Sequence, residues 1–375
     1  PPLALHGASP VLRGHGGASA EGCVMIYLDY FSTTPCDPAV VDAMLPWFAE
    51  DYGNPHSVHG PGQKAAQAVE RARQSVADLL GVEARELVFT SGATEANNLA
   101  IKGAVRHFRR MGDERRRVIT VATEHKCVLE SVRDLEAEGV EPVILGVDSQ
   151  GRVDPAELQN ALAVPTLLVS IMAANNETGV LQDIPDLSRI VRGTGALFHT
   201  DMAQMAGKLP VSLTDVDLAS FSAHKMYGPK GIGALYVRRR PRVRLQPLFS
   251  GGGQERAFRS GTLPTPLVVG FGKAAELAAQ RLEADILQIS ARHDDLWGQI
   301  KTALPDCDLN GGEAIRLPGA LTICLPDGVR ATDILEHVPD VAMSTGSACS
   351  AAEITPSYVL TAMGLSAEKA SRCLR

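Results

Sequence analysis

The chain alternates short apolar runs with longer segments whose apolar residues recur at helical spacing, and this alternation constrains the fold more than any other feature. The apolar runs, which we interpret as strands, are residues 87–89, 118–121, 142–145, 166–172, 196–199, 218–221 and 232–237. The segments with helical spacing are residues 63–80, 95–109, 128–137, 155–162, 187–191 and 265–304. Strands that alternate with helices indicate a mostly parallel sheet covered on both faces. We therefore predict an α/β fold.

The pattern changes after Leu304, where the periodic segments become shorter. Strand-like runs and helical patterns there suggest a smaller α+β domain, with strands at 320–324 and 341–344 and helices at 331–337 and 357–363. At the other end, residues 1–24 are rich in Gly, Ala, Ser and Pro and show no apolar periodicity. We interpret them as a disordered leader or an upstream extension, with a mitochondrial presequence as the alternative.

Composition excludes several classes of protein. The chain has 375 residues and a net charge of -7, which argues against a general nucleic-acid-binding face. No apolar run approaches the roughly 20 residues that span a bilayer, so we expect no membrane insertion. The 7 cysteines are sparse and form no C-x-x-C pair, so we expect no metal site and no disulfide scaffold. A reducing compartment follows, and we predict a cytoplasmic protein, with the mitochondrial matrix as the alternative.

Small and polar residues follow the first predicted strand. Residues 91–98 read SGATEANN and join that strand to a helix, so Ala93 and Thr94 lie where backbone N–H groups and the helix dipole favour an anion. An ordinary capped turn is the alternative for this segment alone.

Four later strands also end in polar side chains. These side chains are His125, Asn176, the pair Asp201 and Gln204, and the group Ser222, His224 and Lys225. In an open α/β sheet, ligands bind beyond the carboxyl ends of the strands. We therefore expect these side chains to meet in one site.

One chemistry needs these groups together. Pyridoxal 5'-phosphate (PLP) withdraws electrons from a substrate while it is bound to a lysine, with a carboxylate at its ring nitrogen. Lys225 supplies the amine and Asp201 the carboxylate. His125 can stack on the ring and move protons, and Gln204 can donate to the ring hydroxyl. The residues that can hold the phosphate are Thr94, Ser222 and His224.

Longer motifs resemble one family over almost the whole chain, from Tyr27 to Arg375. The motifs are YLDYFSTTP (27–35), YGNPHSVH (52–59), SGATEANN (91–98), EHK (124–126), NNETG (175–179), SFSAHKMYGPKGIGALYVRR (220–239), GGGQERAFRSGT (251–262) and STGSACS (344–350). The chain resembles the class V aminotransferases, and within them the group I cysteine desulfurases of the NifS/IscS type. The resemblance implies PLP fold type I, with a mostly parallel sheet of the seven-stranded type in a large domain and a smaller α+β domain.

The resemblance also assigns roles to matching positions. Lys225 would bind PLP covalently, Asp201 and Gln204 would contact its ring, and His125 would be the stacked acid and base. Other cofactor contacts would come from Ala93, Thr94, Asn176, Ser222 and His224. Thr262 would reach the phosphate of the partner subunit's cofactor, which implies a homodimer.

The domain boundaries follow from the same resemblance. We expect residues 25–40 to form an N-terminal arm that joins the small domain. Residues 41–280 would form the large PLP-binding domain, and residues 281–375 the small domain with the cysteine segment.

Cys349 decides which reaction the family resemblance implies. It lies in the small-residue segment STGSACS, which suits a mobile loop. PLP-dependent conversion of L-cysteine to L-alanine would transfer the sulfur to Cys349 as a persulfide. The sulfur would then pass to an acceptor or scaffold protein, for iron–sulfur clusters or another sulfur-containing cofactor. We interpret the other cysteines as structural or incidental, although Cys127 lies two residues from His125.

Arg375 is the last residue and corresponds to the arginine that binds the substrate carboxylate in the family. Asn176 would contact the same carboxylate. Family members usually continue for several tens of residues, so we expect a truncated small domain. The chain also departs from the family pattern at Phe31, Ser32 and Met202, which would change packing near the ring.

Two alternatives remain open. A selenocysteine lyase shares the NNETG and GGGQE motifs, but Cys349 favours the desulfurase because it supplies a sulfur acceptor. The other alternative is a PLP-binding but inactive interaction protein.

Overall fold

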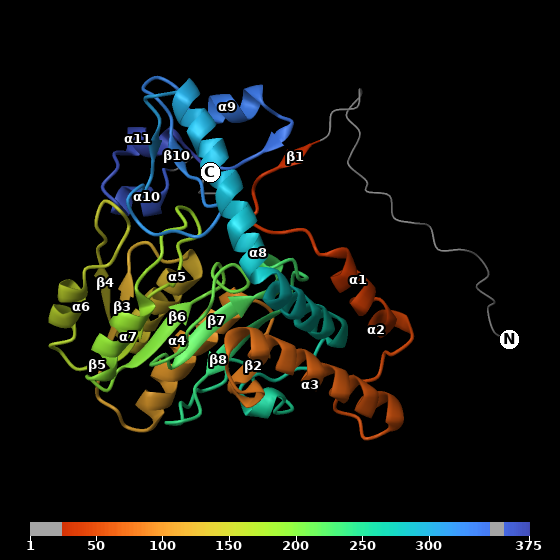
Figure 1. Ribbon diagram of the computed structural model, residues 1–375. Coiled ribbons are helices and arrows are strands. Elements are labelled where there is room, and N and C mark those ends of the chain that lie inside the picture. Colours follow the sequence, from red (N-terminus) through yellow and green to blue (C-terminus); the bar gives the residue numbers. More distant parts are fainter. Residues whose placement is uncertain (1–24, 346–355) are drawn as a thin grey trace, which may run out of the picture.

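The computed structural model describes residues 25–345 and 356–375, and a seven-stranded sheet lies at its centre (Figure 1). The strand order is β2-β8-β7-β6-β5-β3-β4, and only β8 runs antiparallel to its neighbours. The strands are β2 (Leu87–Thr90), β3 (Arg117–Val121), β4 (Glu141–Leu145), β5 (Thr166–Ser170), β6 (Leu197–Asp201), β7 (Leu218–Ser222) and β8 (Gly233–Val237). The predicted mostly parallel sheet and α/β class are confirmed.

Neighbouring residues of each strand face opposite sides of the sheet, and helices bury both sides. Val88 and Val118 pack on one side with helices α4 (Ala93–Arg110) and α5 (Lys126–Asp134). Phe89 and Ile119 belong to the core on the other side. The main helices of that second core are α3 (Gly60–Leu80), α6 (Pro155–Ala161), α7 (Ile184–Arg192) and α8 (Thr265–Ala303).

Two small sheets form a second lobe at the top of Figure 1. In one, β10 (Ile323–Cys324) pairs antiparallel with β9 (Asp308–Leu309) and with β12 (Cys373–Leu374). In the other, β1 (Ile26–Tyr27) pairs with β11 (Val341–Ala342). The helices of this lobe are α9 (Ala331–His337), α10 (Tyr358–Ala362) and α11 (Ala367–Ser371).

Helix α8 links the two lobes and passes residue 280 without a break (Figure 1). A division of the chain at residues 280 and 281 would therefore fall inside a helix. The predicted domain boundaries stay a prediction.

Sequence periodicity was less accurate outside the central sheet. The strand expected at 320–324 is limited to Ile323–Cys324, because Ala320 N–H donates to Leu317 O and closes a turn. The strand expected at 341–344 ends at Ala342. Two short helices, α1 (Pro38–Met44) and α2 (Pro46–Ala49), were not predicted, although Asp37 caps α1 and both begin with proline.

A buried ion pair fixes the loop that carries the motif at 251–262. The Arg73 guanidinium contacts both carboxylate oxygens of Glu255, at 2.7 and 2.8 Å, and Phe89 N–H donates to the same carboxylate at 2.7 Å. Glu255, Arg256 and Ala257 all have positive φ angles, between 47° and 65°. Such backbone persists only where its surroundings hold it, and the ion pair to α3 provides that support.

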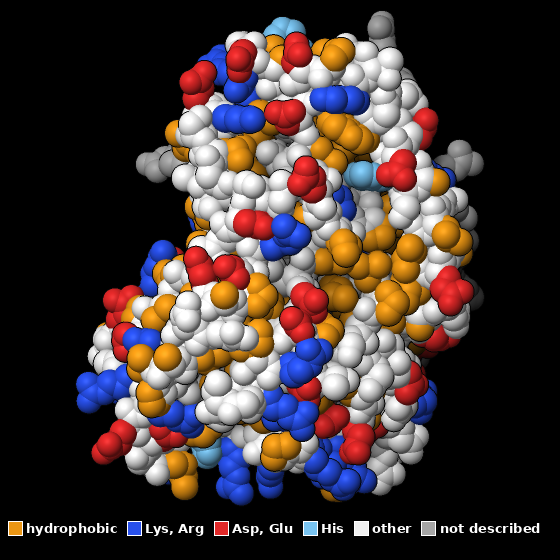
Figure 2. Space-filling view, turned by 60° about the vertical axis from the view of Figure 1, so that its left-hand side comes forward, with side chains coloured by type: hydrophobic (Ala, Val, Ile, Leu, Met, Phe, Trp, Pro, Cys, Tyr) orange, Lys and Arg blue, Asp and Glu red, His pale blue; other side chains and the backbone are white. Residues whose placement is uncertain are grey.

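Positive and negative side chains are interspersed on the face shown in Figure 2, with hydrophobic side chains gathered toward its right-hand side. Within residues 25–345 and 356–375, every helix is too short or too polar to cross a bilayer.

Candidate active site

A cavity of ≈ 540 Å³ lies beside the carboxyl ends of β6 and β7 and the start of α4. Most of the predicted site residues line it: Ala93, Thr94, His125, Asn176, Asp201, Gln204, Ser222, His224, Lys225 and Arg375. Side chains that follow five different strands therefore converge in one place, as the sheet topology requires.

One predicted residue is not part of this cavity wall. Thr262 is exposed and is not among the lining residues. Cys349 lies outside the described residues.

The start of α4 forms one end of the cavity. Gly92, at φ 151°, is the N-cap, and Ala93 and Thr94 form the first turn of this 18-residue helix. Residues with a side chain rarely adopt this φ, so glycine suits the cap. Backbone N–H groups and the helix dipole make this end suitable for an anion.

Asp201, the last residue of β6, is buried at another part of the cavity wall. Asn97 Nδ2 donates to its Oδ2 at 2.7 Å, and Ala203 N–H donates to its Oδ1 at 2.9 Å. Asn97, from α4, is fully buried and was not predicted. The sequence feature that could have indicated Asn97 is a polar amide among the buried positions of α4.

His125 is the N-cap of α5 and is linked to Asp201 through two side chains. Its Nδ1 accepts from Cys127 N–H at 3.2 Å and lies 3.0 Å from Cys127 Sγ. Cys127 Sγ in turn lies 3.2 Å from Asn97 Nδ2. The chain of contacts therefore runs from His125 through Cys127 and Asn97 to Asp201.

The direction of this chain follows from the chemistry of its members. A carboxylate only accepts, so the atom of Asn97 that faces Asp201 must be the amide nitrogen. The second hydrogen of that nitrogen points to Cys127 Sγ. Cys127 N–H donates to His125 Nδ1, so this nitrogen carries no proton, and the thiol hydrogen shares the same acceptor. We assign the neutral tautomer of His125 with its proton on Nε2 from this network.

The charge states agree with this assignment. Burial lowers the pKa of His125. Asp201 raises it, while Lys225 and Lys126 lower it, and the net effect is a lowered pKa. The imidazole is therefore neutral near neutral pH. Burial and the Asp201 carboxylate raise the pKa of Cys127 to about 12, so its sulfur stays a thiol.

Lys225 follows β7 in the short turn Ala223–Lys225. Its Nζ donates to Phe31 O at 2.6 Å and to Ser32 O at 2.8 Å. Gln204 Nε2 also donates to Phe31 O, at 2.9 Å, while its Oε1 accepts from Lys208. The N-terminal segment thus positions the lysine and the glutamine through its backbone.

His224 and Ser222 complete the wall near the start of α4. Burial and the neighbouring Lys225 lower the pKa of His224 to about 4, so this imidazole is also neutral near neutral pH. Its Nδ1 lies 3.0 Å from Thr33 Oγ1. Both side chains can donate to an anion without adding a positive charge.

Arg375 reaches the cavity from β12. Its guanidinium donates to Asn176 O at 2.7 Å, to Asp29 Oδ1 at 2.8 Å and to Ser32 Oγ at 2.7 Å. Backbone hydrogen bonds in both directions join Arg375 to Ser344. Asn176 Oδ1 is buried and has no hydrogen-bond partner among the described residues, so it can accept from a ligand.

A protein-family model described as aminotransferase class-V matches residues 26–373. A curated protein of Rickettsia bellii named cysteine desulfurase IscS is 48% identical over 353 residues, which is 93% of this chain and 85% of that protein. A human protein named cysteine desulfurase is 49% identical over 93% of this chain and 76% of its own length.

A solved structure gives the same indication. A NifS-like protein superposes with a TM-score of 0.85 at 36% identity, covering 94% of this chain and 93% of its own.

Proposed function

Because this chain belongs to the class-V aminotransferase family, we propose that its cavity binds PLP and that the protein is a cysteine desulfurase. It converts L-cysteine to L-alanine and passes the sulfur through Cys349 to an acceptor. The observation that carries this proposal is the meeting of Lys225, Asp201 and the start of α4 in one cavity.

The residues of the cavity fit PLP. A phosphate suits the start of α4, where Thr94, Ser222 and His224 offer further donors. Asp201 is a carboxylate fixed by two hydrogen bonds, as a partner for a protonated ring nitrogen must be. Lys225 is the amine on the same cavity wall. When bound here, PLP would withdraw electrons from the substrate Cα.

The remaining steps belong to side chains of the chain itself. Arg375 binds the carboxylate of L-cysteine, and Asn176 lies beside it. Lys225 Nζ removes the α-proton of the substrate, and His125, with its proton on Nε2, is placed to return a proton to the product. Asn97 and Cys127 orient Asp201 and His125 through their hydrogen bonds.

Sulfur transfer requires a thiolate at Cys349. This thiolate attacks the sulfur of the substrate, so that one S–S bond forms while the Cβ–S bond breaks. The electron pair of the broken bond stays on Cβ, which takes up a proton as L-alanine forms. Cys349 carries the sulfur as a persulfide until an acceptor or scaffold protein for iron–sulfur assembly removes it. A catalytic free thiol suits a reducing compartment, in the cytoplasm or the mitochondrial matrix.

The functional unit in this proposal is a homodimer. Thr262 is exposed and lies away from the cavity of its own chain, as expected of a residue that contacts the partner's phosphate. Exposed apolar side chains near the N-terminal segment offer an interface: Met25, Ile26, Leu45, Phe48, Tyr52 and Val58.

The test is the measurement of alanine and sulfide from L-cysteine. Wild-type protein forms both, Lys225→Ala forms neither, and Cys349→Ser retains the visible colour of bound PLP but releases no sulfide. Unchanged sulfide release by Cys349→Ser contradicts the persulfide step. Activity on selenocysteine but not on cysteine indicates a selenocysteine lyase, and no alanine from wild-type protein indicates an inactive PLP-binding protein.

A further inference from the structure

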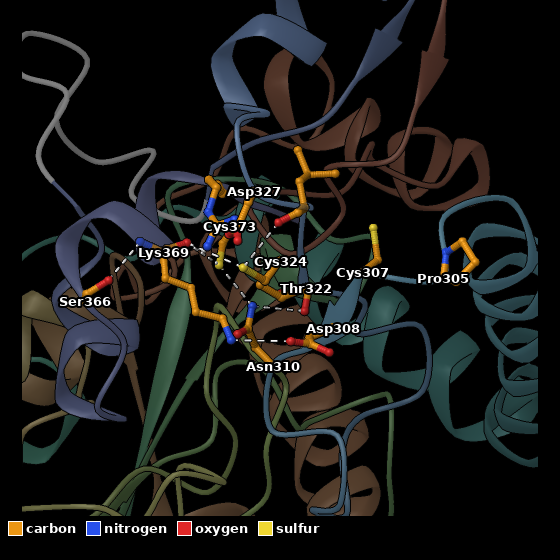
Figure 3. Close-up of polar contacts among 12 residues, drawn as sticks. Pro305, Cys307, Asp308, Asn310, Thr322, Cys324, Asp327, Ser366, Lys369 and Cys373 are labelled. Carbon is orange, nitrogen blue, oxygen red and sulfur yellow. Dashed lines mark hydrogen bonds and ion pairs between the residues drawn. The ribbon is translucent and has the colours of Figure 1, made fainter.

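Two buried cysteines face one another across the small sheet of the upper lobe. Cys324 in β10 is opposite Cys373 in β12, although 48 residues separate them in the sequence. Both side chains are almost fully buried, with 2% and 1% of their surface exposed. Figure 3 shows the two sulfur atoms side by side, while Cys307 lies apart from them.

The register of the strands places this pair at a site that suits a disulfide. Leu325 N–H donates to Arg372 O, so a hydrogen bond between the strands lies beside the cysteine pair rather than within it. Cys324 and Cys373 therefore occupy the non-hydrogen-bonded position, where Cα atoms are about 4.5 Å apart. Disulfides span Cα distances of about 4.4–6.8 Å, so the backbone already has a suitable spacing.

The side chains converge as well. Both sulfur atoms contact the carbonyl of Lys369, Cys324 Sγ at 3.6 Å and Cys373 Sγ at 3.4 Å. Asn310 Nδ2 donates to Cys373 Sγ at 3.2 Å. The Lys369 carbonyl and the Asn310 amide thus surround the two sulfur atoms in one small volume (Figure 3).

The electrostatics favour one thiolate at this site. A hydrogen bond from Cys373 lowers the pKa of Cys324 to about 7 against the effect of burial, and Lys369 and Arg372 add to the lowering. The pKa of Cys373 is raised, because its proton is shared with Cys324 and because it is buried. A paired thiolate and thiol is the arrangement from which disulfides form.

We propose that Cys324 and Cys373 are a reversible oxidation site, which closes to a disulfide with a peroxide and alters substrate binding at Arg375. The Cys324 thiolate attacks one peroxide oxygen and becomes a sulfenic acid, while the other oxygen leaves as hydroxide and is protonated to water. Cys373 then attacks the Cys324 sulfur, the S–S bond forms and a second water leaves. The two thiols lose two electrons, which reduce the peroxide.

The link to Arg375 rests on the proposed function and on the path of β12. Cys373 is two residues from Arg375, whose guanidinium holds Asn176 and Ser32 in the cavity. The sulfur atoms must move from hydrogen-bond contact to a bond of about 2.05 Å. Because disulfides most often span about 5.5–6 Å between Cα atoms, the closed bond pushes β12 away from β10, and it takes the Cys373 acceptor away from Asn310. We expect it to displace the Arg375 guanidinium.

Mass spectrometry tests the oxidation site without any use of activity. The reduced PLP-bound enzyme is treated with hydrogen peroxide, free thiols are blocked with N-ethylmaleimide, and peptides are mapped without reductant. The expected result is a peptide linked through Cys324 and Cys373 that disappears after dithiothreitol. It is lost in Cys324→Ser and retained in Cys307→Ser, a matched control at a buried cysteine in the same lobe. Blocked thiols at both positions, or a link to Cys307, would overturn the proposal.

A second measurement tests the link to substrate binding. It is made in a Cys349→Ser background, so that oxidation of Cys349 plays no part, and it follows the visible absorbance of bound PLP during titration with L-cysteine. Disulfide formation is expected to weaken binding several-fold, with recovery after dithiothreitol and no change when Cys324→Ser is added. Unchanged affinity in the oxidised protein overturns the link to Arg375. Absence of bound PLP would instead count against the proposed function, while the disulfide map stands by itself.

Discussion

Two regions of the molecule contain buried cysteines whose pKa values are shifted in opposite directions. In the cavity, burial and the Asp201 carboxylate raise the pKa of Cys127 to about 12. In the small sheet, a hydrogen bond from Cys373, together with nearby cations, lowers the pKa of Cys324 to about 7 although that side chain is also buried.

The difference shows that burial alone does not decide what a cysteine can do. Cys127 accepts one amide hydrogen from Asn97 but faces a carboxylate, so its proton stays and serves His125. Cys324 has a thiol donor and the positive charges of Lys369 and Arg372 around it. The donors and charges around the sulfur, rather than its exposure, separate a fixed hydrogen-bond donor from a redox-active thiol.

The largest expected effect is on the thiolate population itself. Near neutral pH, pKa values of about 7 and about 12 imply thiolate fractions that differ by roughly four to five orders of magnitude. Titration of the thiolate ultraviolet absorbance should show a step near pH 7 that is lost in Cys324→Ser and unchanged in Cys127→Ser. Loss of this step in Cys127→Ser would show instead that Cys127 is the thiolate near pH 7, which contradicts the account.

The next largest expected effect is a loss of activity when Asn97, which contacts both Asp201 and Cys127 in the cavity, is replaced. Asn97→Ala removes the donor to Asp201 and to Cys127. A hydrogen bond to a charged group contributes about 1.5–3 kcal/mol, so kcat should fall about 10- to 100-fold. Alanine formation from L-cysteine measures it. The matched control is Asn98→Ala on the same helix, since the Asn98 side chain donates to Thr94 O within α4, and equal losses in both variants would contradict the role of Asn97.

Stability should depend on pH with opposite sign at the two sites. The pKa of Cys324 is about 7 in the folded protein against an ordinary value of 9.0, so its contribution is present above pH 9 and is lost as the pH falls through 7. The free energy of unfolding should rise between pH 7 and 9 by on the order of 2 kcal/mol from this group. In denaturant unfolding, the free energy of unfolding of Cys324→Ser should change less with pH in this range than that of the wild type.

Cys127 provides the contrast for that measurement. Its pKa is raised from 9.0 to about 12, so the unfolded chain releases this proton first and stability falls as the pH rises above 9. Cys127→Ser should reduce this fall and leave the rise between pH 7 and 9 unchanged. If neither variant alters the pH dependence of the free energy of unfolding, the electrostatic difference between the two sites is contradicted.

The smallest effect is on the pH dependence of catalysis. The thiol of Cys127 donates to His125 Nδ1 and thereby opposes protonation of the imidazole. Cys127→Ala should raise the pKa of His125 and move the acid limb of the kcat profile to higher pH, while Cys127→Ser, which keeps a donor, should restore it. Identical profiles for the two variants would show that the thiol does not lower the pKa of His125.

The central part of the site was predictable from the sequence, because its residues follow strands. His125, Asp201 and Lys225 each come directly after an apolar run, and a parallel sheet brings such positions together. Asn97 was missed because an amide inside a helix has no signature of its own. The role of Cys127 was missed because it depends on the rotation of one side chain toward His125.

The oxidation site shows where sequence reasoning fails in physical terms. Cys324 and Cys373 lie in strands of only two residues each, too short for any periodicity. A shift of one residue in their register would separate the two sulfur atoms to opposite faces. Only the fold supplies that register, and the sequence alone therefore predicts a structural or incidental role for both cysteines.

The central claim is that the cavity holds PLP on Lys225, and borohydride reduction followed by peptide mapping tests it most directly. The account predicts that the purified protein, reduced with borohydride in the presence of PLP, carries the phosphopyridoxyl mass on Lys225. Two other lysines lie close enough to serve as internal controls: Lys230, which lines the same cavity, and Lys208, which contacts Gln204. The cofactor mass on Lys230 or Lys208, or on no lysine, would contradict the account.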